Sequence, residues 1–136
     1  MEICNNAYGS FFSIKQQVIL KNNNIEFDEN INVLNIESNN NNIKILISGV
    51  YLIHFIAYFD QPCQLAIFIN NKLDDTSIIA CNTYNNCIAM HHIYKLNEND
   101  TLSIKNFVSY GIITTSILGG LIPQSKNVEL SIHKIN

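Results

Sequence analysis

Hydrophobic and polar residues alternate along this chain in short runs that are separated by polar turns. The longest apolar run, from Val50 to Phe59, follows Gly49 and contains one polar side chain, His54. Branched and aromatic residues dominate the run, so it predicts a strand. Both faces of this strand are apolar, and both therefore need a cover. We expect a facing sheet to cover one face and a partner subunit to cover the other.

The strand that we predict at 50–59 presents alternate side chains on opposite faces. One face carries Tyr51, Ile53, Phe55, Ala57 and Phe59. The other face carries Val50, Leu52, His54, Ile56 and Tyr58. A register error of one residue exchanges the two sets, so the pattern leaves open which face is core and which is interface.

Shorter runs of the same kind recur at intervals of about eight to twelve residues. Asparagine-rich segments separate many of them, and Asn70-Asn71 predicts a hairpin turn. The predicted strands lie at 7–14, 16–20, 25–28, 31–36, 43–47, 63–69, 72–73, 76–81, 87–96, 101–106, 112–118 and 128–135. About ten short strands without a helical pattern predict an all-β sandwich or jelly roll, in a single domain over residues 1–136.

The composition of the chain argues against some classes of binding partner and against a membrane-spanning segment. The chain has 136 residues, of which 14% are charged, and a net charge of −3. Its basic residues are all lysines, which argues against nucleic-acid recognition. No apolar run reaches the roughly 18 residues of a membrane span. Residues 1–6 lack the basic and apolar regions of a secretory signal, so we expect a protein kept inside the producing cell or one without its leader.

Six short motifs follow one another in the order of a known family. They are Ala7-Tyr8-Gly9-Ser10-Phe11, Ile25-Glu26-Phe27-Asp28, Ser48-Gly49-Val50-Tyr51-Leu52-Ile53, Ala66-Ile67-Phe68-Ile69-Asn70-Asn71, Leu96-Asn97-Glu98-Asn99-Asp100-Thr101-Leu102-Ser103-Ile104 and Val128-Glu129-Leu130-Ser131-Ile132. This series resembles the C-terminal globular domain of BclA-type collagen-like spore-surface (exosporium) glycoproteins, in the C1q/TNF-like superfamily. Asn71 and Asn99 stand where the family pattern has glycine, and asparagine tolerates the same left-handed geometry. The chain contains no Gly-X-Y collagen segment, and Cys81 and Cys87 are not part of the family pattern.

The resemblance implies a ten-stranded jelly roll of two five-stranded antiparallel sheets that assembles as a homotrimer. It also implies a place on the surface layer of a spore, reached without a secretory signal. We therefore expect a non-enzymatic, trimerising structural module of a spore or another outer surface layer. The alternative is a receptor- or glycan-binding head, in which the exposed loops 39–42, 74–75 and 82–86, with Tyr84, contact a host receptor, a glycan or other surface-layer proteins.

The residues that we expect in the trimer interface or the core come from three apolar strands. They are Tyr51, Ile53, His54, Phe55, Ile56, Tyr58, His92, Tyr94 and Ile113. If the face that carries His54 is the interface, protonation would bring positive charges together and weaken the trimer at acid pH.

Side chains that often carry chemistry form no recognised site. Cys81, Cys87, His91 and His92 are zinc-ligand types, but their spacing is unusual, and adjacent histidines on a strand point to opposite faces. The paired carboxylates lie in turns, and no nucleophile motif is present. We expect no catalytic residue, metal or cofactor. Cys81 and Cys87 flank a polar loop and either form a disulfide or remain thiols, and the redox states of Cys4 and Cys63 stay open.

Overall fold

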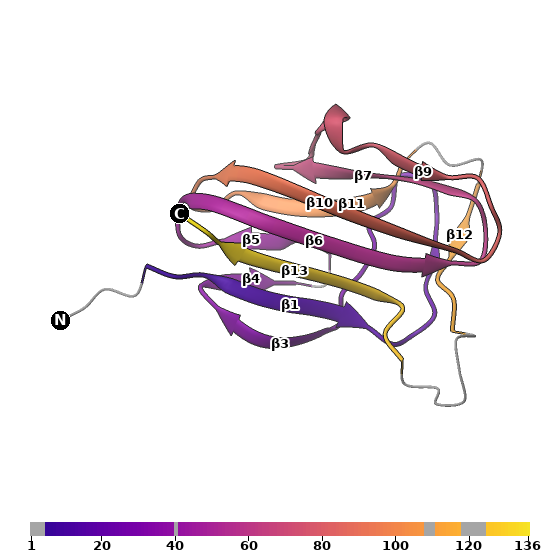
Figure 1. Ribbon diagram of the computed structural model, residues 1–136, viewed down its shortest axis with the longest axis horizontal. Helices are drawn as coiled ribbons and strands as arrows, with labels where there is room; N and C mark the ends of the chain where they lie inside the picture. The colour runs from indigo at the N-terminus through magenta and orange to yellow at the C-terminus, as the bar shows by residue number, and fades with distance from the viewer. Residues whose placement is uncertain (1–4, 40, 108–110, 118–124) are drawn as a thin grey trace.

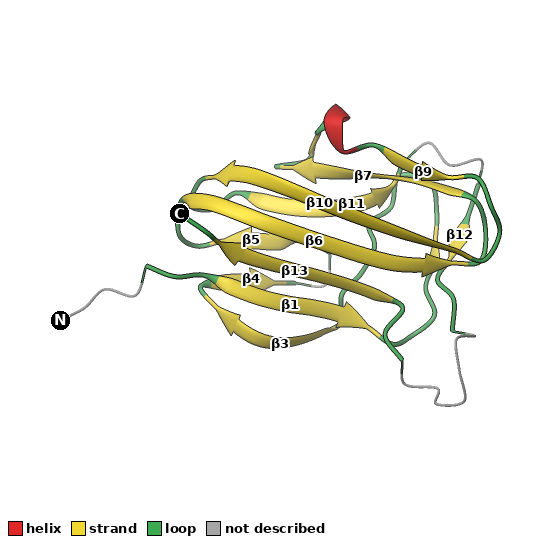
Figure 2. Ribbon diagram, in the orientation of Figure 1, coloured by secondary structure: helices red, strands yellow, loops and turns green. Residues whose placement is uncertain are grey.

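The computed structural model describes residues 5–39, 41–107, 111–117 and 125–136, and these residues form two antiparallel sheets packed face to face (Figures 1 and 2). The strands are β1 (Tyr8–Ser13), β2 (Val18–Ile19), β3 (Glu29–Leu34), β4 (Ile36–Ser38), β5 (Ile43–Ile45), β6 (Gly49–Phe59), β7 (Cys63–Ile69), β8 (Lys72–Leu73), β9 (Ile79–Cys81), β10 (Asn86–Leu96), β11 (Thr101–Asn106), β12 (Ile113–Thr114) and β13 (Val128–Lys134). Within the described ranges the helical structure is one 3-10 turn, η1 (Asp75–Ser77).

The two sheets differ in size. The first has five strands in the order β10-β6-β13-β1-β3. The second has six strands, in the order β4-β5-β11-β7-β8, with β9 also paired to β7. A small ladder joins β2 and β12. The predicted jelly roll of two antiparallel sheets is confirmed. The described residues divide into thirteen strands, because the outer edges of the second sheet are built from short separate strands.

The core lies between the two sheets, and β6 shows how the alternation builds it. Tyr51, Ile53, Ala57 and Phe59 are fully buried, and Phe55 is 2% exposed. The six-stranded sheet meets them with buried branched residues that include Ile43, Ile45, Leu65, Ile67 and Ile104. The odd-numbered face of β6 is thus the core face, which answers the question that the sequence pattern left open.

Asparagines form many of the turns. Asn70 and Asn71 have φ angles of 52° and 62° and connect β7 to β8, so the predicted hairpin is confirmed as a turn with two left-handed residues. Asn99 has a φ of 73° in the turn before β11. The asparagines that replace the family's glycines therefore adopt the left-handed geometry that glycine would supply.

Four predicted strands differ from the structure. The strand predicted at 31–36 is divided at Asn35 between β3 and β4, which belong to different sheets, and the one predicted at 76–81 begins in η1 and continues as β9. Residues 25–28 are not a strand, although Ile25 and Phe27 are buried and Glu26 and Asp28 are exposed as the alternation predicted. Their backbone lies beside β11, where the Ile25 amide donates to the Ile104 carbonyl at 2.8 Å, without a continuous ladder. The strand predicted at 112–118 is reduced to β12, and residue 118 lies outside the described residues.

Candidate functional site

The outer side of the five-stranded sheet is a surface that the core does not use. We call it the front face and define it as the side chains of β1, β6, β10 and β13 that point away from the core. They are Tyr8, Ser10, Phe12, Val50, Leu52, His54, Ile56, Tyr58, Cys87, Ala89, His91, Ile93, Lys95, Glu129, Ser131 and His133. Strand alternation places them together, because every residue between them in β6 and most of those in the other strands are buried in the core.

Strand register arranges the front face in rows that cross the sheet. One row contains Ile93, Leu52, His133 and Tyr8. Another contains Ala89, Ile56, Glu129 and Phe12. Ile93 is 65% exposed, Tyr58 42% and Tyr8 37%. These large apolar side chains are exposed, with Ile93 on the edge strand β10 and with Tyr8 and Tyr58 at or near the ends of β1 and β6.

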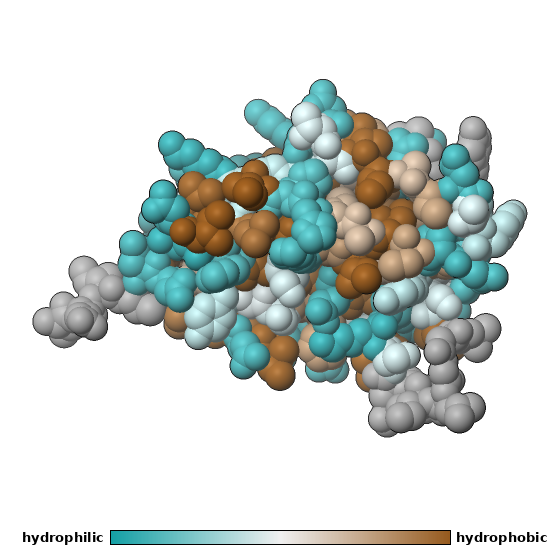
Figure 3. Space-filling model, viewed as in Figure 1, coloured by the Kyte–Doolittle hydropathy of each residue, from teal (hydrophilic) through white to brown (hydrophobic). Residues whose placement is uncertain are grey.

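A polar row lies between these two. It contains His91, His54, Ser131 and Ser10. The rings of His54 and His91 are direct cross-strand neighbours, with centroids 4.2 Å apart and planes 67° to each other. Figure 3 shows hydrophilic residues between two apolar areas on this side of the molecule. The histidine pair therefore divides the apolar surface at its middle.

The charged side chains of the front face are Glu129 on β13 and Lys95 on β10, and both lie outside the middle row. Lys126 Nζ lies 2.6 Å from Glu129 Oε2 and 4.6 Å from the centroid of the Phe12 ring. Glu129 is thus neutralised from within the chain, and Phe12 is partly covered by the same lysine. Lys95 lies near the opposite edge, on β10. The centre of the face presents imidazole, hydroxyl and hydrocarbon groups and no carboxylate or ammonium.

The residues predicted for the interface or the core separate into three groups. Tyr51, Ile53, Phe55 and Ile113 are core residues, each at most 2% exposed. The Tyr51 hydroxyl donates to the Ile47 carbonyl oxygen at 2.6 Å, and burial raises the pKa of this tyrosine.

The second group, His54, Ile56 and Tyr58, lies on the front face. The third group, His92 and Tyr94, lies half-buried on the core side of β10. The predicted set therefore mixed the two faces of β6, since no sequence feature distinguished them.

Tyr94 joins the two sheets at one edge of the sandwich. Its hydroxyl donates to a carboxylate oxygen of Asp74, the residue that caps η1, and the His92 ring stacks on Tyr94 with centroids 5.6 Å apart. Burial alone would raise the pKa of Asp74, but hydrogen bonds from Tyr94 and Thr76, together with His92, leave it lowered. Burial and the neighbouring Asp74 raise the pKa of Tyr94. Asp74, which was predicted as an exposed loop residue, therefore stabilises the fold by capping η1 and accepting the hydrogen bond from Tyr94.

The disulfide considered between Cys81 and Cys87 is not formed, and both are free thiols. The two cysteines belong to different sheets. Cys81 ends β9 and pairs in register with Cys63 of β7, whereas Cys87 lies on the front face beside Tyr58. Adjacency in the sequence across a loop therefore did not bring the two thiols together. Cys4 lies outside the described residues.

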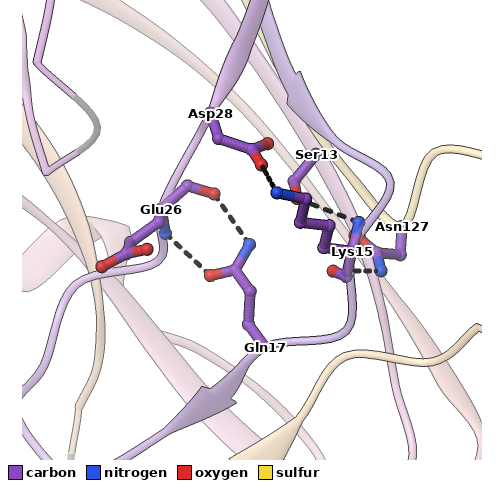
Figure 4. A network of polar contacts seen from close by, with 6 residues as sticks. All are labelled: Ser13, Lys15, Gln17, Glu26, Asp28 and Asn127. Carbon is purple, nitrogen blue, oxygen red and sulfur yellow. Dashed lines mark hydrogen bonds and ion pairs between the residues drawn. The ribbon is translucent and has the colours of Figure 1, made fainter.

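An open polar depression of about 540 Å³ lies beside the connection between β1 and β2. Gln17 crosses it, with its amide nitrogen donating to the Glu26 carbonyl at 2.8 Å and its amide oxygen accepting from the Glu26 backbone at 2.9 Å (Figure 4). Lys15 Nζ lies 3.7 Å from Asp28, and Asn127 donates to the Lys15 carbonyl at 2.8 Å. These polar groups hold the connection in place.

The structure does not assemble a metal centre from the predicted ligand types. Within the described ranges no three His, Cys, Asp or Glu side chains are grouped so that they could hold a metal ion. His91 and His92 point to opposite sides of β10, as their adjacency required. No helix in the same ranges is long and apolar enough to cross a membrane.

Several front-face residues were absent from the predicted set. Tyr8, Phe12, Ile93 and His133 lie on the same surface as His54, although they come from three different strands. The alternating pattern of each strand contained this information, but the pattern alone did not say which strands are neighbours. Register across the sheet is what unites them.

Comparisons with known proteins identify the fold. No family model matches the sequence, and no curated protein matches it. Among solved structures, an Eiger TNF structure from S. frugiperda has a TM-score of 0.69 at 12% identity, covering 97% of this chain and 94% of that chain.

The globular domain of zebrafish complement 1qA has a TM-score of 0.67 at 10% identity, covering 96% and 98%. Murine APRIL, in a crystal structure at pH 8.0, has a TM-score of 0.65 at 10% identity, covering 96% and 99%. The chain therefore has the same jelly-roll fold as these complement 1qA and TNF-type domains.

Proposed function

We propose that this protein is a non-enzymatic head module that assembles as a homotrimer through its front face. The observation that carries the proposal is the apolar surface of β6 and its neighbours, with Ile93 65% exposed in the row that also holds Leu52. An uncovered apolar face of this kind on a sheet is typical of an association surface. The C1q/TNF-like fold and the resemblance to collagen-like spore-surface proteins, which implies a homotrimer, both support it.

A second copy of the same chain is the occupant that best fits this chemistry. The centre of the front face carries no carboxylate or ammonium, so a charged partner would find no complement there. Burying apolar surface contributes roughly 25 cal/mol per Å², and stable interfaces bury on the order of 800 Å² per partner. Side chains such as Leu52, Ile56 and Tyr58 would supply the apolar part, and the serines and histidines of the middle row would supply polar contacts.

The mass of the protein in solution tests this proposal. We expect light scattering to give three times 15.4 kDa for the unmodified chain. Ile93→Glu would place a charge in the interface and shift the mass toward one chain. Leu20→Glu is the matched control, because Leu20 is 50% exposed but lies outside the front face, and it should keep the trimer. A monomeric unmodified chain at concentrations of about 100 μM would rule the proposal out, since that is far above the dissociation constant of a stable interface.

The place of the module follows from the same resemblance. We propose that it forms part of an outer surface layer, of a spore or of another extracellular structure. The resemblance to exosporium proteins supports this. Antibodies against the folded chain should label intact spores or particles of the source without permeabilisation. Labelling that requires permeabilisation would contradict a surface position.

A receptor- or glycan-binding head is the second candidate, and one observation favours it. Tyr84 is 72% exposed in the loop between β9 and β10, where asparagines surround it. An aromatic ring beside amide groups suits a sugar, which offers both an apolar face and hydroxyls. Glycan-array binding that Tyr84→Ala abolishes, while the mass of the assembly is unchanged, would support this function. An array without any binding would remove the support that Tyr84 lends to a glycan ligand.

A further inference from the structure

Two cysteines lie directly opposite each other on neighbouring strands. Cys63 begins β7 and Cys81 ends β9, and the antiparallel ladder pairs them in register. Opposed residues in such a ladder have Cα atoms about 4.5 or 5.5 Å apart, and disulfides span Cα distances of about 4.4–6.8 Å. Opposed residues also point to the same side of the sheet. Cys63 is 5% exposed, and the half-buried Cys81 packs against the same core.

We infer that Cys63 and Cys81 are a cross-strand dithiol that closes to a disulfide when the protein meets a low-molecular-weight disulfide such as oxidised glutathione. The inference is independent of the proposed trimer, because both residues lie in the six-stranded sheet, away from the front face. It assigns Cys63, and not Cys87, as the disulfide partner of Cys81, unlike the pairing that the sequence analysis considered. Cys87 points outward from the other sheet, beside Tyr58, and is no partner for a thiol that faces the core.

The surroundings of the two thiols assign them different roles. Cys81 Sγ lies 3.3 Å from Thr83 Oγ1, and hydrogen bonding by Thr83 lowers the pKa of the Cys81 thiol. Burial, followed by the neighbouring Cys81, raises the pKa of Cys63 to about 12. Since the thiolate is the nucleophile in disulfide exchange, Cys81 reacts with the reagent first and Cys63 completes the bond.

The exchange proceeds in two balanced steps. The Cys81 thiolate attacks one sulfur of the reagent disulfide, the sulfur–sulfur bond breaks, and one reagent thiolate leaves. Cys63 then gives its proton to that thiolate or to water, and its sulfur attacks Cys81 Sγ and expels the second reagent thiolate. The protein loses two protons and two electrons, which together are two hydrogen atoms, and the reagent disulfide becomes two thiols. Because the pKa of Cys63 is high, the second step is the slower one, and the mixed disulfide on Cys81 accumulates transiently.

The bond would link the short edge strand β9 covalently to β7 in the six-stranded sheet. Only three residues of β9 form a ladder with β7, and the segment between the two strands contains β8 and η1. This segment also includes Asp74, which accepts the hydrogen bond from Tyr94 of the opposite sheet. Closing the disulfide would therefore restrict local opening of residues 70–81 and keep the Tyr94–Asp74 contact in place.

The test follows the thiols by mass spectrometry. The fully reduced protein is incubated with oxidised glutathione and quenched with acid at intervals. We expect an early glutathione adduct on Cys81, followed by a species that has lost two hydrogens and yields a linked peptide containing Cys63 and Cys81. Hydrogen exchange of residues 70–81 should slow several-fold in the oxidised species, and the thermal midpoint should rise.

Variants separate this pair from the other cysteines. Cys81→Ser should abolish both the early adduct and the two-hydrogen loss, whereas Cys87→Ser, at an exposed position, should leave both unchanged. The inference is overturned by a linked peptide that joins Cys81 to Cys87 or to Cys4. A glutathione adduct on Cys81 that never resolves would also overturn it, as would a protein whose Cys63 and Cys81 both stay reduced while Cys87 is modified.

Discussion

The two sheets of this sandwich finish their outer surfaces in different ways. On the six-stranded sheet, the outward residues include Glu37 and Lys44, paired across β4 and β5, and Lys105, whose ammonium lies 4.9 Å from the Phe68 ring centroid. Phe107 packs against the same ring, with centroids 5.9 Å apart. On the six-stranded sheet, the outward ring of Phe68 is therefore covered by Lys105 and Phe107. Among the described residues, the front face has no comparable cover over the row in which Ile93 and Leu52 adjoin.

This difference is the structural basis of the proposed assembly. Both sheets bury their inner residues equally well, so the stability of the sandwich does not require the front face. The six-stranded sheet interacts with water through lysine, glutamate and glutamine, as an antiparallel sheet with one solvated face normally does. The front face keeps that architecture but has only two charged side chains and two largely apolar rows, which is the reason for proposing that a second copy of the chain packs there.

The largest expected effect separates the two faces of β6. Phe55→Ala should lower the free energy of unfolding by about 3–5 kcal/mol, because the ring is 2% exposed and its removal leaves a cavity. Leu52→Ala, on the front face of the same strand, should change monomer stability by less than about 1 kcal/mol. Urea unfolding of both variants in the monomeric Ile93→Glu background measures the contrast. Equal losses would contradict the assignment of the odd-numbered face as the core.

A smaller effect concerns the contact between the sheets at Tyr94. Tyr94→Phe removes the hydrogen bond to Asp74 and should cost about 1 kcal/mol at pH 7. The folded pKa of Asp74 is lowered from the ordinary value of 3.8, so its contribution is present above that value and is lost as pH falls through the folded pKa. The difference between wild type and Tyr94→Phe should therefore close below about pH 4.

Urea unfolding at pH 7, 5 and 3 measures this difference. Asp74→Asn is the matched control, because it removes the charge at every pH and should flatten this part of the profile. A difference between wild type and Tyr94→Phe that is as large at pH 3 as at pH 7 would show that the carboxylate is not the group that Tyr94 stabilises.

The smallest expected effect tests how the six-stranded sheet covers Phe68. Lys105→Ala should cost about 0.5–1 kcal/mol, the size of an exposed cation–π contact together with the lost packing of the lysine stem. The mass of the assembly should not change, because Lys105 lies away from the front face. A change in oligomeric state caused by Lys105→Ala would mean that the outer surface of the six-stranded sheet takes part in assembly.

Strands and turns could be predicted from the sequence wherever a few adjacent residues determine the local backbone conformation. The alternation of β6, β10, β11 and β13 predicted strands at nearly their observed bounds. Asn71 and Asn99 were expected to tolerate left-handed geometry, and both have positive φ, as does Asn70 in the predicted hairpin turn. Residues 25–28 show the limit of this reasoning. Their alternation correctly predicted which side chains are buried, but burial beside β11 did not require a ladder.

Contacts between strands that lie far apart in the sequence could not be predicted from these local patterns. Cys81 was considered with Cys87, six positions away, whereas its register partner is Cys63. His54 was singled out, but its neighbour His91 and the front-face residues Tyr8 and Ile93 became a surface only when β1, β6, β10 and β13 were placed side by side. Strand order in a sheet depends on packing energies summed over the whole domain, which short-range patterns do not contain.

The sequence by itself determined that this protein is all-β, that one long strand is apolar on both sides, and that its turns can be built from asparagine. Tertiary structure alone decided that Tyr51, Ile53 and Phe55 face the core while Leu52, His54 and Ile56 face outward. The physical reason is that strand periodicity defines two faces but does not label them. Which face of β6 is buried depends on the sheet that packs against it, and that sheet is formed by residues elsewhere in the chain.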